Sequence, residues 1–189
     1  MSHFATVETQ IRDIAALRAA CAEMGFTLNE NAEARGYGSN KTHGDFVIRL
    51  KGPYDIAVNR QPDGGFGLTT DWWGGHVEKE AGKDYGRLLQ LYAVHKAQIA
   101  ARRKGLTFRR SALADGSVKL VIGGLWQMAK TIEVIVQTDG AVKIDAVGFK
   151  GADCEKATAF LEKALGAVKG RQKKPEYRQH AQAQQRLGG

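Results

Sequence analysis

The stretch FVIRLKGPYDIAVNRQPDGGFGLTTDWW, residues 46–73, decides the fold of this chain. Apolar and polar residues alternate through three segments of it, at 46–51, 54–59 and 66–72. Gly52-Pro53 and Pro62–Gly65 separate the segments, and both read as turns because proline presets one corner and glycine tolerates positive φ. Strict alternation buries one face of a sheet and leaves the other in water. The stretch therefore predicts three consecutive antiparallel strands.

The residues before this stretch predict a strand and a helix. Residues 3–9 alternate and include β-branched side chains, which is typical of a strand. Apolar residues at helical spacing then predict a helix between Ile11 and Met24, with Gly25 as its C-terminal stop. Residues 26–28 predict a short strand, and the polar, glycine-containing segment 29–44 predicts a loop.

The residues after the stretch predict a long helix and a hairpin. Asp84 can cap a helix that runs to about Lys104. Leu106–Leu113 and Val118–Ile122 flank Asp115-Gly116, a strong hairpin signal. The order strand, helix, strands, helix, hairpin predicts an α+β fold of two layers, in which helices cover one face of an antiparallel sheet.

A second, smaller unit is expected further along the chain. Residues 131–136 and 142–146 predict a hairpin around Thr138–Gly140, and an apolar stripe predicts a helix from Asp153 that Gly166 ends. A unit this small is insecure alone, so its hairpin is expected to pack on the first domain or on another protein. We expect three parts: an α+β antiparallel-sheet domain at 1–125, a ββα unit at 129–167, and a basic, flexible tail at 168–189.

Charge and composition narrow the class of protein. The 189 residues carry a net charge of +8, and residues 169–189 hold six basic side chains against one acidic. Such a tail can attract an anionic partner, or it can simply keep the protein in solution. No apolar run approaches the roughly 20 residues that span a bilayer. Because the start of the chain also lacks a signal-peptide pattern, we expect a cytoplasmic protein without a membrane partner.

Catalytic and metal-binding patterns are missing from the sequence. Cys21 and Cys154 lie on apolar helix stripes, although the position of Cys154 near a helix N-terminus could lower its pKa. The histidines show no i, i+4 pair, and we expect His95 to be a partly buried hydrogen-bonding residue. The phosphate-binding pattern GxxxxGK[ST] does not occur. We therefore predict no enzyme, no catalytic residue, no metal and no cofactor.

The aromatic residues suggest a protein-binding surface. Two adjacent tryptophans on a strand must face opposite sides, so Trp72 is expected in the core and Trp73 on the outer face. An exposed indole is a plausible binding anchor, unless a loop or the C-terminal unit covers it. The residues we expect to contact a partner are Trp73, Trp126 and Tyr177.

Two alternatives remain open. Basic residues with aromatic neighbours could bind nucleic acid, and the candidates are Arg102, Arg103, Lys104, Arg109, Arg110, Lys169, Arg171, Lys173, Lys174 and Arg178. The terminal Gly188-Gly189 is similar to the ends of ubiquitin-like modifiers and sulfur carriers, which an adenylating enzyme activates at the carboxylate. The preceding segment, however, lacks the remaining strands of their β-grasp fold.

Several blocks of the sequence resemble known families. SHFATVETQIRD, DFVIRLKGPYDIAVNRQPDGGFGLTTDWWGG and LLQLYAVHKAQIAARRKGLTF resemble the conserved reading-frame family of cyanobacteria and plastids, a domain of unknown function. KTIEVIVQTDGAVKIDAVGFKGADCEKATAFLEKALG resembles a second, smaller family of unknown function. The resemblance implies that the two units work together, since fusion raises their effective concentration.

The resemblance also implies a class of partner. Genes of these families tend to lie near one for an AAA-type ATPase, and neither family supplies catalytic residues. We therefore expect a non-enzymatic binding or adaptor subunit whose partner is an AAA-type ATPase or a complex that the ATPase remodels. The alternatives are a nucleic-acid-binding accessory protein and a modifier or carrier activated at Gly189.

Overall fold

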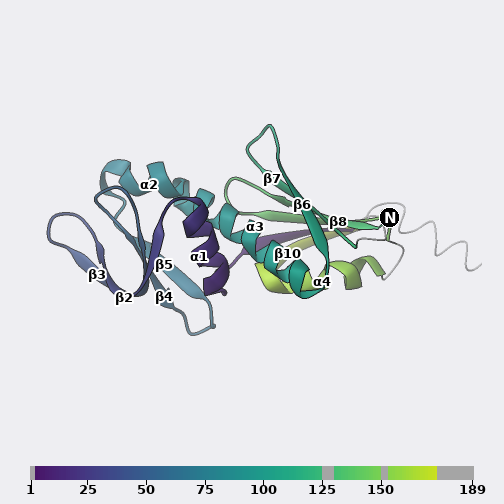
Figure 1. Ribbon diagram of the computed structural model, residues 1–189, viewed down its shortest axis with the longest axis horizontal. Helices are drawn as coiled ribbons and strands as arrows, with labels where there is room; N and C mark the ends of the chain where they lie inside the picture. The colour runs from purple at the N-terminus through teal and green to yellow at the C-terminus, as the bar shows by residue number, and fades with distance from the viewer. Residues whose placement is uncertain (1–2, 125–129, 150–152, 174–189) are drawn as a thin grey trace, which may run out of the picture. The chain divides into compact units, whose positions relative to one another are not determined.

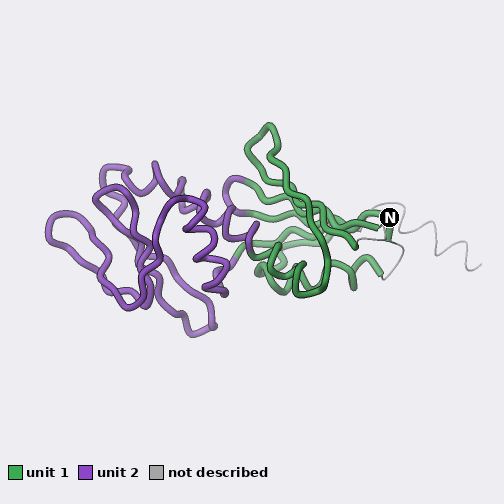
Figure 2. Tube along the Cα trace, in the orientation of Figure 1, with its two compact units in different colours: residues 1–9, 96–137, 141–189 green, residues 10–95, 138–140 purple. Residues whose placement is uncertain are grey.

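The computed structural model describes residues 3–124, 130–149 and 153–173 of the chain (Figure 1). They divide into two compact units, coloured separately in Figure 2. Unit 1 takes in residues 1–9, 96–137 and 141–189, and unit 2 takes in residues 10–95 and 138–140. Each unit has its own antiparallel sheet, so the predicted α+β class is confirmed.

Unit 2 contains a four-stranded sheet in the order β2-β3-β4-β5. The strands are β2 (Thr27–Arg35), β3 (Lys41–Arg49), β4 (Ile56–Arg60) and β5 (Phe66–Thr70). The predicted meander of three strands is present as β3, β4 and β5, although the third strand stops two residues before the tryptophans. The helices that begin in this unit are α1 (Ile14–Glu23), α2 (His76–Ala81) and α3 (Gly86–Arg103), and α3 continues into unit 1.

Two side chains fix the start of helix α1. The carboxylate of Asp13 accepts hydrogen bonds from the backbone N–H groups of Ala15 and Ala16, which are unpaired in the first turn of any helix. The hydroxyl oxygen of the fully buried Tyr92 accepts from the backbone N–H groups of Arg12 and Asp13, at 2.9 and 3.2 Å. Helix α3 thereby holds the beginning of α1 in place.

The predicted loop at 29–44 is wrong, because most of this segment forms the β2–β3 hairpin. Its polar composition reflects exposure, since β2 buries only Leu28 and Ala34. Ala34 packs with Val47 and Ala57 in a cluster of small side chains. Gly44 permits this close approach, because a Cβ there would lie 3.3 Å from that of Ala57.

Unit 1 contains a six-stranded sheet in the order β10-β1-β9-β8-β7-β6. Its strands are β1 (His3–Thr9), β6 (Thr107–Ala112), β7 (Val118–Gly123), β8 (Thr131–Val136), β9 (Val142–Val147) and β10 (Gly166–Lys173). Helix α4 (Asp153–Leu165) packs against β1, β9 and β10. Alternate residues of β7, β8 and β9 are buried, as the sequence pattern predicts for strands with one covered face.

The structure corrects the predicted division at residues 125–129. Strand β8 pairs with β7 along its whole length, and the N-terminal strand β1 pairs with β9 on one side and β10 on the other. The hairpin at 131–147 is therefore the centre of a larger sheet. A short ββα segment buries too little apolar surface alone, and these pairings supply the missing contacts.

The predicted flexible tail is also corrected in its first part. Residues 166–173 form β10 directly after α4, and Lys169 and Arg171 belong to this strand. Two further expectations differ for local reasons. Asp84 does not cap α3, because it lies in a 3₁₀ turn with a φ of 50° and the helix begins at Gly86. The short helix α2 lies in a segment for which the sequence predicted no element. Within the described ranges, no helix is long and apolar enough to cross a membrane.

The place of β1 inside the sheet predicts a large effect of a small change. Val7 is fully buried, whereas its neighbour Thr6 is exposed on the same strand. We expect Val7→Ala to lower the free energy of unfolding by about 2 kcal/mol, through lost burial and the cavity left behind. We expect Thr6→Ser to change it by less than about 0.5 kcal/mol. Urea denaturation measures both, and equal effects would contradict the position of β1.

Candidate binding surface

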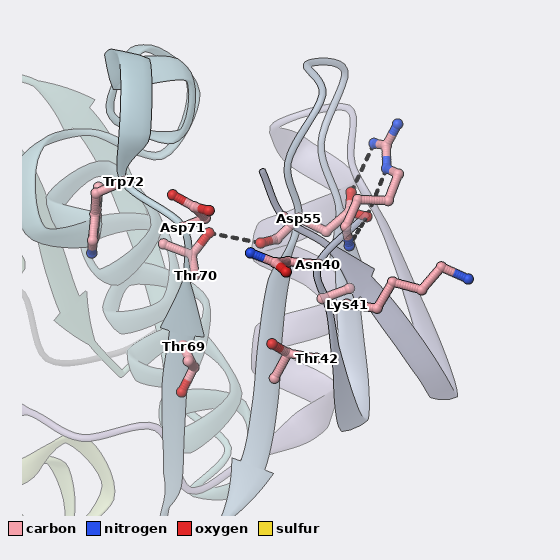
Figure 3. Close-up of a pocket in the computed structure, with 11 residues that line it drawn as sticks. Asn40, Lys41, Thr42, Asp55, Thr69, Thr70, Asp71 and Trp72 are labelled. Atoms are coloured by element: carbon pink, nitrogen blue, oxygen red, sulfur yellow. Dashed lines mark hydrogen bonds and ion pairs between the residues drawn. The ribbon is translucent and has the colours of Figure 1, made fainter. Parts of the chain in front are cut away.

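Asp55 lies where the strand ends of unit 2 meet. Its carboxylate is fully buried and accepts hydrogen bonds from Arg35 Nε and Nη2, each at 2.8 Å, and from Arg49 Nη1. The backbone N–H groups of Arg35 and Leu50 also donate to it, at 3.0 and 3.2 Å. Its own backbone carbonyl accepts from the Thr70 hydroxyl at 2.7 Å (Figure 3). One residue thus ties together the ends of β2, β3 and β5.

The ionisation of Asp55 follows from these contacts. Burial opposes the charged form, but the hydrogen bonds from Arg35, Arg49 and Leu50 outweigh it and hold the pKa of Asp55 below its ordinary value. Arg35 is held in place in return, because its Nη2 also donates to the carbonyl oxygens of Leu50 and Gly52 at 3.1 and 2.9 Å. The pair therefore joins the ends of strands, and the charge of Arg35 is paired with that of Asp55.

Asp71 organises the loops next to this network. Its Oδ2 accepts from the backbone N–H of Tyr37 and its Oδ1 from that of Trp73, both at 2.9 Å. The bond to Trp73 closes a turn of the Asx type, in which aspartate bonds to the backbone two residues on. These two donors lower the pKa of Asp71, so its carboxylate stays ionised. The β2–β3 turn and the segment after β5 are thereby joined at one side chain.

The joined loops present an aromatic patch, which we define as Tyr37, Trp72 and Trp73. These side chains are 53, 40 and 61% exposed. The rings of Tyr37 and Trp73 pack at a centroid distance of 4.7 Å, and Trp72 packs against Tyr85 at the same distance. Exposed aromatic rings fixed by such contacts lose little conformational entropy on binding.

Backbone strain accompanies the patch. Asp84 and Tyr85 have φ angles of 50° and 62°, in the left-handed region that side chains with a Cβ rarely adopt. Burial raises the pKa of Tyr85 to about 12, so the ring beneath Trp72 is a neutral phenol. Strain of this kind persists where the surrounding structure imposes it, and here it places Tyr85 against Trp72.

A polar cleft of about 460 Å³ lies beside the patch in unit 2 (Figure 3). Residues from the β2–β3 turn line it together with the end of β5 and the segment that follows. The lining residues with polar or aromatic side chains are Arg35, Asn40, Lys41, Thr42, Asp55, Thr69, Thr70, Asp71 and Trp72.

The structure corrects the expected orientation of the two tryptophans. Strand β5 ends at Thr70, and Trp73 begins a 3₁₀ turn, so the alternation of a strand does not apply to them. Gly74 and Gly75, with φ angles of 72° and 67°, let the chain turn away at once. As a result both indoles are exposed, and Trp72 is not a core residue.

The basic candidates fall into two groups. Arg102, Arg103, Lys104, Arg109 and Arg110 are exposed at the end of α3 and on β6. On β10, Lys169 forms an ion pair with Glu8 at 2.6 Å, and Arg171 forms one with the buried Glu162 at 2.7 Å. Lys173 is the last residue of β10. The predicted sites at Trp126, Lys174, Tyr177, Arg178, Gly188 and Gly189 lie outside the described residues.

Nucleophiles and metal ligands are not assembled in the described ranges. Cys21 and Cys154 are buried free thiols. Burial raises the pKa of Cys21 to about 12 and also raises that of Cys154, which corrects the expected lowering at a helix N-terminus. Within the same ranges, no three His, Cys, Asp or Glu side chains could hold a metal together. His95 is confirmed as a hydrogen-bonding residue, 2.7 Å from a carboxylate oxygen of Glu23.

Sequence reasoning missed Asp71, Tyr37 and the threonines of the cleft. The hydrogen bond from the Trp73 backbone to Asp71 could have been predicted, because an aspartate in a turn commonly accepts from the backbone N–H two residues further on. Tyr37 fell in the segment mistaken for a loop. Thr42 and Thr69 look like ordinary strand residues in the sequence. Only the folded sheet, in which β4 lies between β3 and β5, brings them to one cleft.

The fold and surface define a two-unit, antiparallel α+β protein with an exposed aromatic patch and a polar cleft on one unit. The chain belongs to the family described as protein of unknown function (DUF1257), whose model matches residues 20–121. A second model, protein of unknown function (DUF2997), matches residues 132–178. The search of curated proteins gives no match. The predicted tandem of two families of unknown function is confirmed.

The network predicts both stability and its pH dependence. We expect Asp55→Asn to lower the free energy of unfolding by about 3 kcal/mol at pH 7, since it leaves Arg35 and Arg49 without their carboxylate. The folded pKa of Asp55 is depressed, so its contribution is present above its unfolded pKa of about 4 and is lost as the pH falls through the folded value. Urea titrations from pH 7 to pH 2 measure this.

The exposed pair Lys41–Glu33 supplies the matched control. Glu33→Gln removes the same charge from the same unit, and we expect a loss of less than about 1 kcal/mol. If the variants Asp55→Asn and Glu33→Gln lost equal stability, the network would not hold the strand ends together.

Proposed function

We propose that the chain is a non-enzymatic binding subunit that contacts a protein partner through the aromatic patch of unit 2. The observation that carries this proposal is the presentation of Tyr37, Trp72 and Trp73, exposed and yet fixed by Asp71 and Tyr85. Tryptophan and tyrosine dominate the energetics of protein interfaces when they are held in place.

The partner we propose is an AAA-type ATPase or a complex that such an ATPase remodels. This choice comes from the resemblance to the reading-frame family and not from the surface itself. The surface also restricts which groups of a partner can bind to it, because the patch carries three aromatic rings. The partner must supply apolar or cationic groups that pack on aromatic faces.

The patch variants test this proposal. We expect the double substitution Tyr37→Ala and Trp73→Ala to weaken partner capture from native cells at least tenfold, since truncated interface anchors cost about 2 kcal/mol or more. Both side chains are exposed, so thermal unfolding should change little. Quantitative mass spectrometry of the captured proteins gives the comparison.

Val147→Ala is the matched control, because Val147 is an exposed apolar residue of unit 1, 39% accessible. It should capture the same proteins as the unchanged chain. Retention of every specific partner by the double patch variant would overturn the proposal.

One observation keeps nucleic-acid binding as a second candidate. Arg102, Arg103, Lys104, Arg109 and Arg110 remain exposed within a short stretch of unit 1. If all five met phosphates of a single strand, the log–log salt slope of binding would be about −3.5, and replacing Arg103 and Arg109 by serine would reduce it by about 1.4. Fluorescence anisotropy with single-stranded DNA measures this. An unchanged slope in that variant would contradict this candidate, and Lys169→Ser, already ion-paired, is the control.

A further inference from the structure

We infer that the polar cleft beside the aromatic patch binds the guanidinium group of a partner's arginine, which pairs with Asp71 and packs against Trp72. The inference rests on the proposed function, since it names what the partner supplies. It is carried by the charges, acceptors and ring that line the cleft.

Apart from Asp71, the charged side chains that line the cleft are balanced by opposite charges. Arg35 is ion-paired with Asp55 and also donates to two carbonyl oxygens, and the second guanidinium on Asp55 belongs to Arg49, which does not line the cleft. The hydrogen bond to Asp55 is the main cause of the raised pKa of Arg35, and the carboxylate of Glu80 adds to it, so two carboxylates balance the guanidiniums of Arg35 and Arg49.

The remaining cation of the lining is already paired. The Lys41 ammonium lies 2.8 Å from Glu33, and Figure 3 shows its side chain running away from the cleft. Because the other charges compensate one another, the ionised Asp71 leaves the cleft with one uncompensated negative charge. The occupant that this charge favours is a cation.

Asp71 also has capacity for further hydrogen bonds. Each of its oxygens accepts one backbone N–H, from Tyr37 and Trp73, whereas a carboxylate offers about four lone-pair sites. More acceptors line the same cleft, in the hydroxyls of Thr42, Thr69 and Thr70 and the amide of Asn40 (Figure 3). These groups could share the several N–H donors of one guanidinium.

Trp72 selects arginine among the possible cations. A guanidinium is planar, weakly hydrated and able to stack on an aromatic face while its N–H groups stay in plane for acceptors. Tryptophan is the best aromatic partner for a cation. Trp72 lines the cleft, is 40% exposed and is fixed by Tyr85, so the ring is ready without rearrangement.

A pair of isosteric peptides tests this inference. The probes are acetyl-Gly-Arg-Gly-amide and acetyl-Gly-citrulline-Gly-amide, which match in shape but differ in charge. In NMR titrations of the full chain at low salt, we expect the arginine peptide to shift the indole N–H signal of Trp72 with an affinity at least tenfold higher than the citrulline peptide. Equal binding of the two peptides, or no binding of either, would overturn the inference.

Two variants act on the cleft by different routes. Asp71→Asn removes the charge, and Thr42→Lys places a cation in the cleft while leaving Asp71 intact. Thr42 is exposed, so its replacement should not disturb the fold. We expect each to weaken arginine-peptide binding at least tenfold. Glu78→Gln, an exposed acidic change on α2 of the same unit, should leave it unchanged. Wild-type affinity in both cleft variants would overturn the inference.

The outcomes separate this inference from the proposed function. If the Tyr37 and Trp73 variant loses its protein partner while Thr42→Lys keeps it at full affinity, the patch binds the partner and the arginine assignment is wrong. If the arginine peptide binds the cleft but the patch variant retains every partner, the cleft assignment stands and the proposed function fails.

Discussion

The carboxylate of Asp55 is the constraint on which unit 2 depends. It is fully buried, and a buried carboxylate is tolerated only when charged and polar donors surround it. Those donors come from the ends of β2 and β3, and Thr70 at the end of β5 bonds to the carbonyl oxygen of Asp55. The requirement to satisfy one anion therefore fixes where the strands of the sheet end. The cleft and the patch begin at these strand ends.

Asp71 also joins separate segments by accepting hydrogen bonds at its carboxylate, nearer to the solvent than Asp55. Asp55 joins the ends of strands, whereas Asp71 joins the turn and the segment that extend from them, through the N–H groups of Tyr37 and Trp73. Exposed indoles are normally mobile and prone to nonspecific contact. Here each one packs on a second ring, and the backbone that carries them is hydrogen-bonded to a single carboxylate. Rigidity of this kind is more useful for binding than for folding, because the rings bury little surface in the unit itself.

The sequence predicted what depends on local pattern. Alternation of apolar and polar residues identified β3, β4 and β5. Turn residues identified the hairpins at Asp115-Gly116 and at 138–140, and an apolar stripe identified the helix from Asp153. It could not predict features that depend on distant partners. The hairpin at 27–49 is polar because it is exposed, so its composition is similar to that of a loop. Asp55 occupies an outward position in the alternating pattern and is buried only because Arg35, twenty residues earlier, returns to it. Trp73 is exposed as predicted, but the prediction that Trp72 lies in the core was wrong, because β5 ends at Thr70 and Asp71 begins a turn before the tryptophans.

The two family matches do not correspond to two independent folds. Most of strand β7 lies in the first match and most of β8 in the second, and the two strands pair along their whole length. Strand β1 precedes both matches, yet it lies between β9 and β10 and so completes the sheet of the second region. Residues 132–173 therefore lack a central strand without the N-terminus of the chain. The fusion does more than raise an effective concentration, because β1 and the strands β6 to β10 form one hydrogen-bonded sheet. Any activity assigned to the second region must be sought in the whole chain, where that sheet is complete.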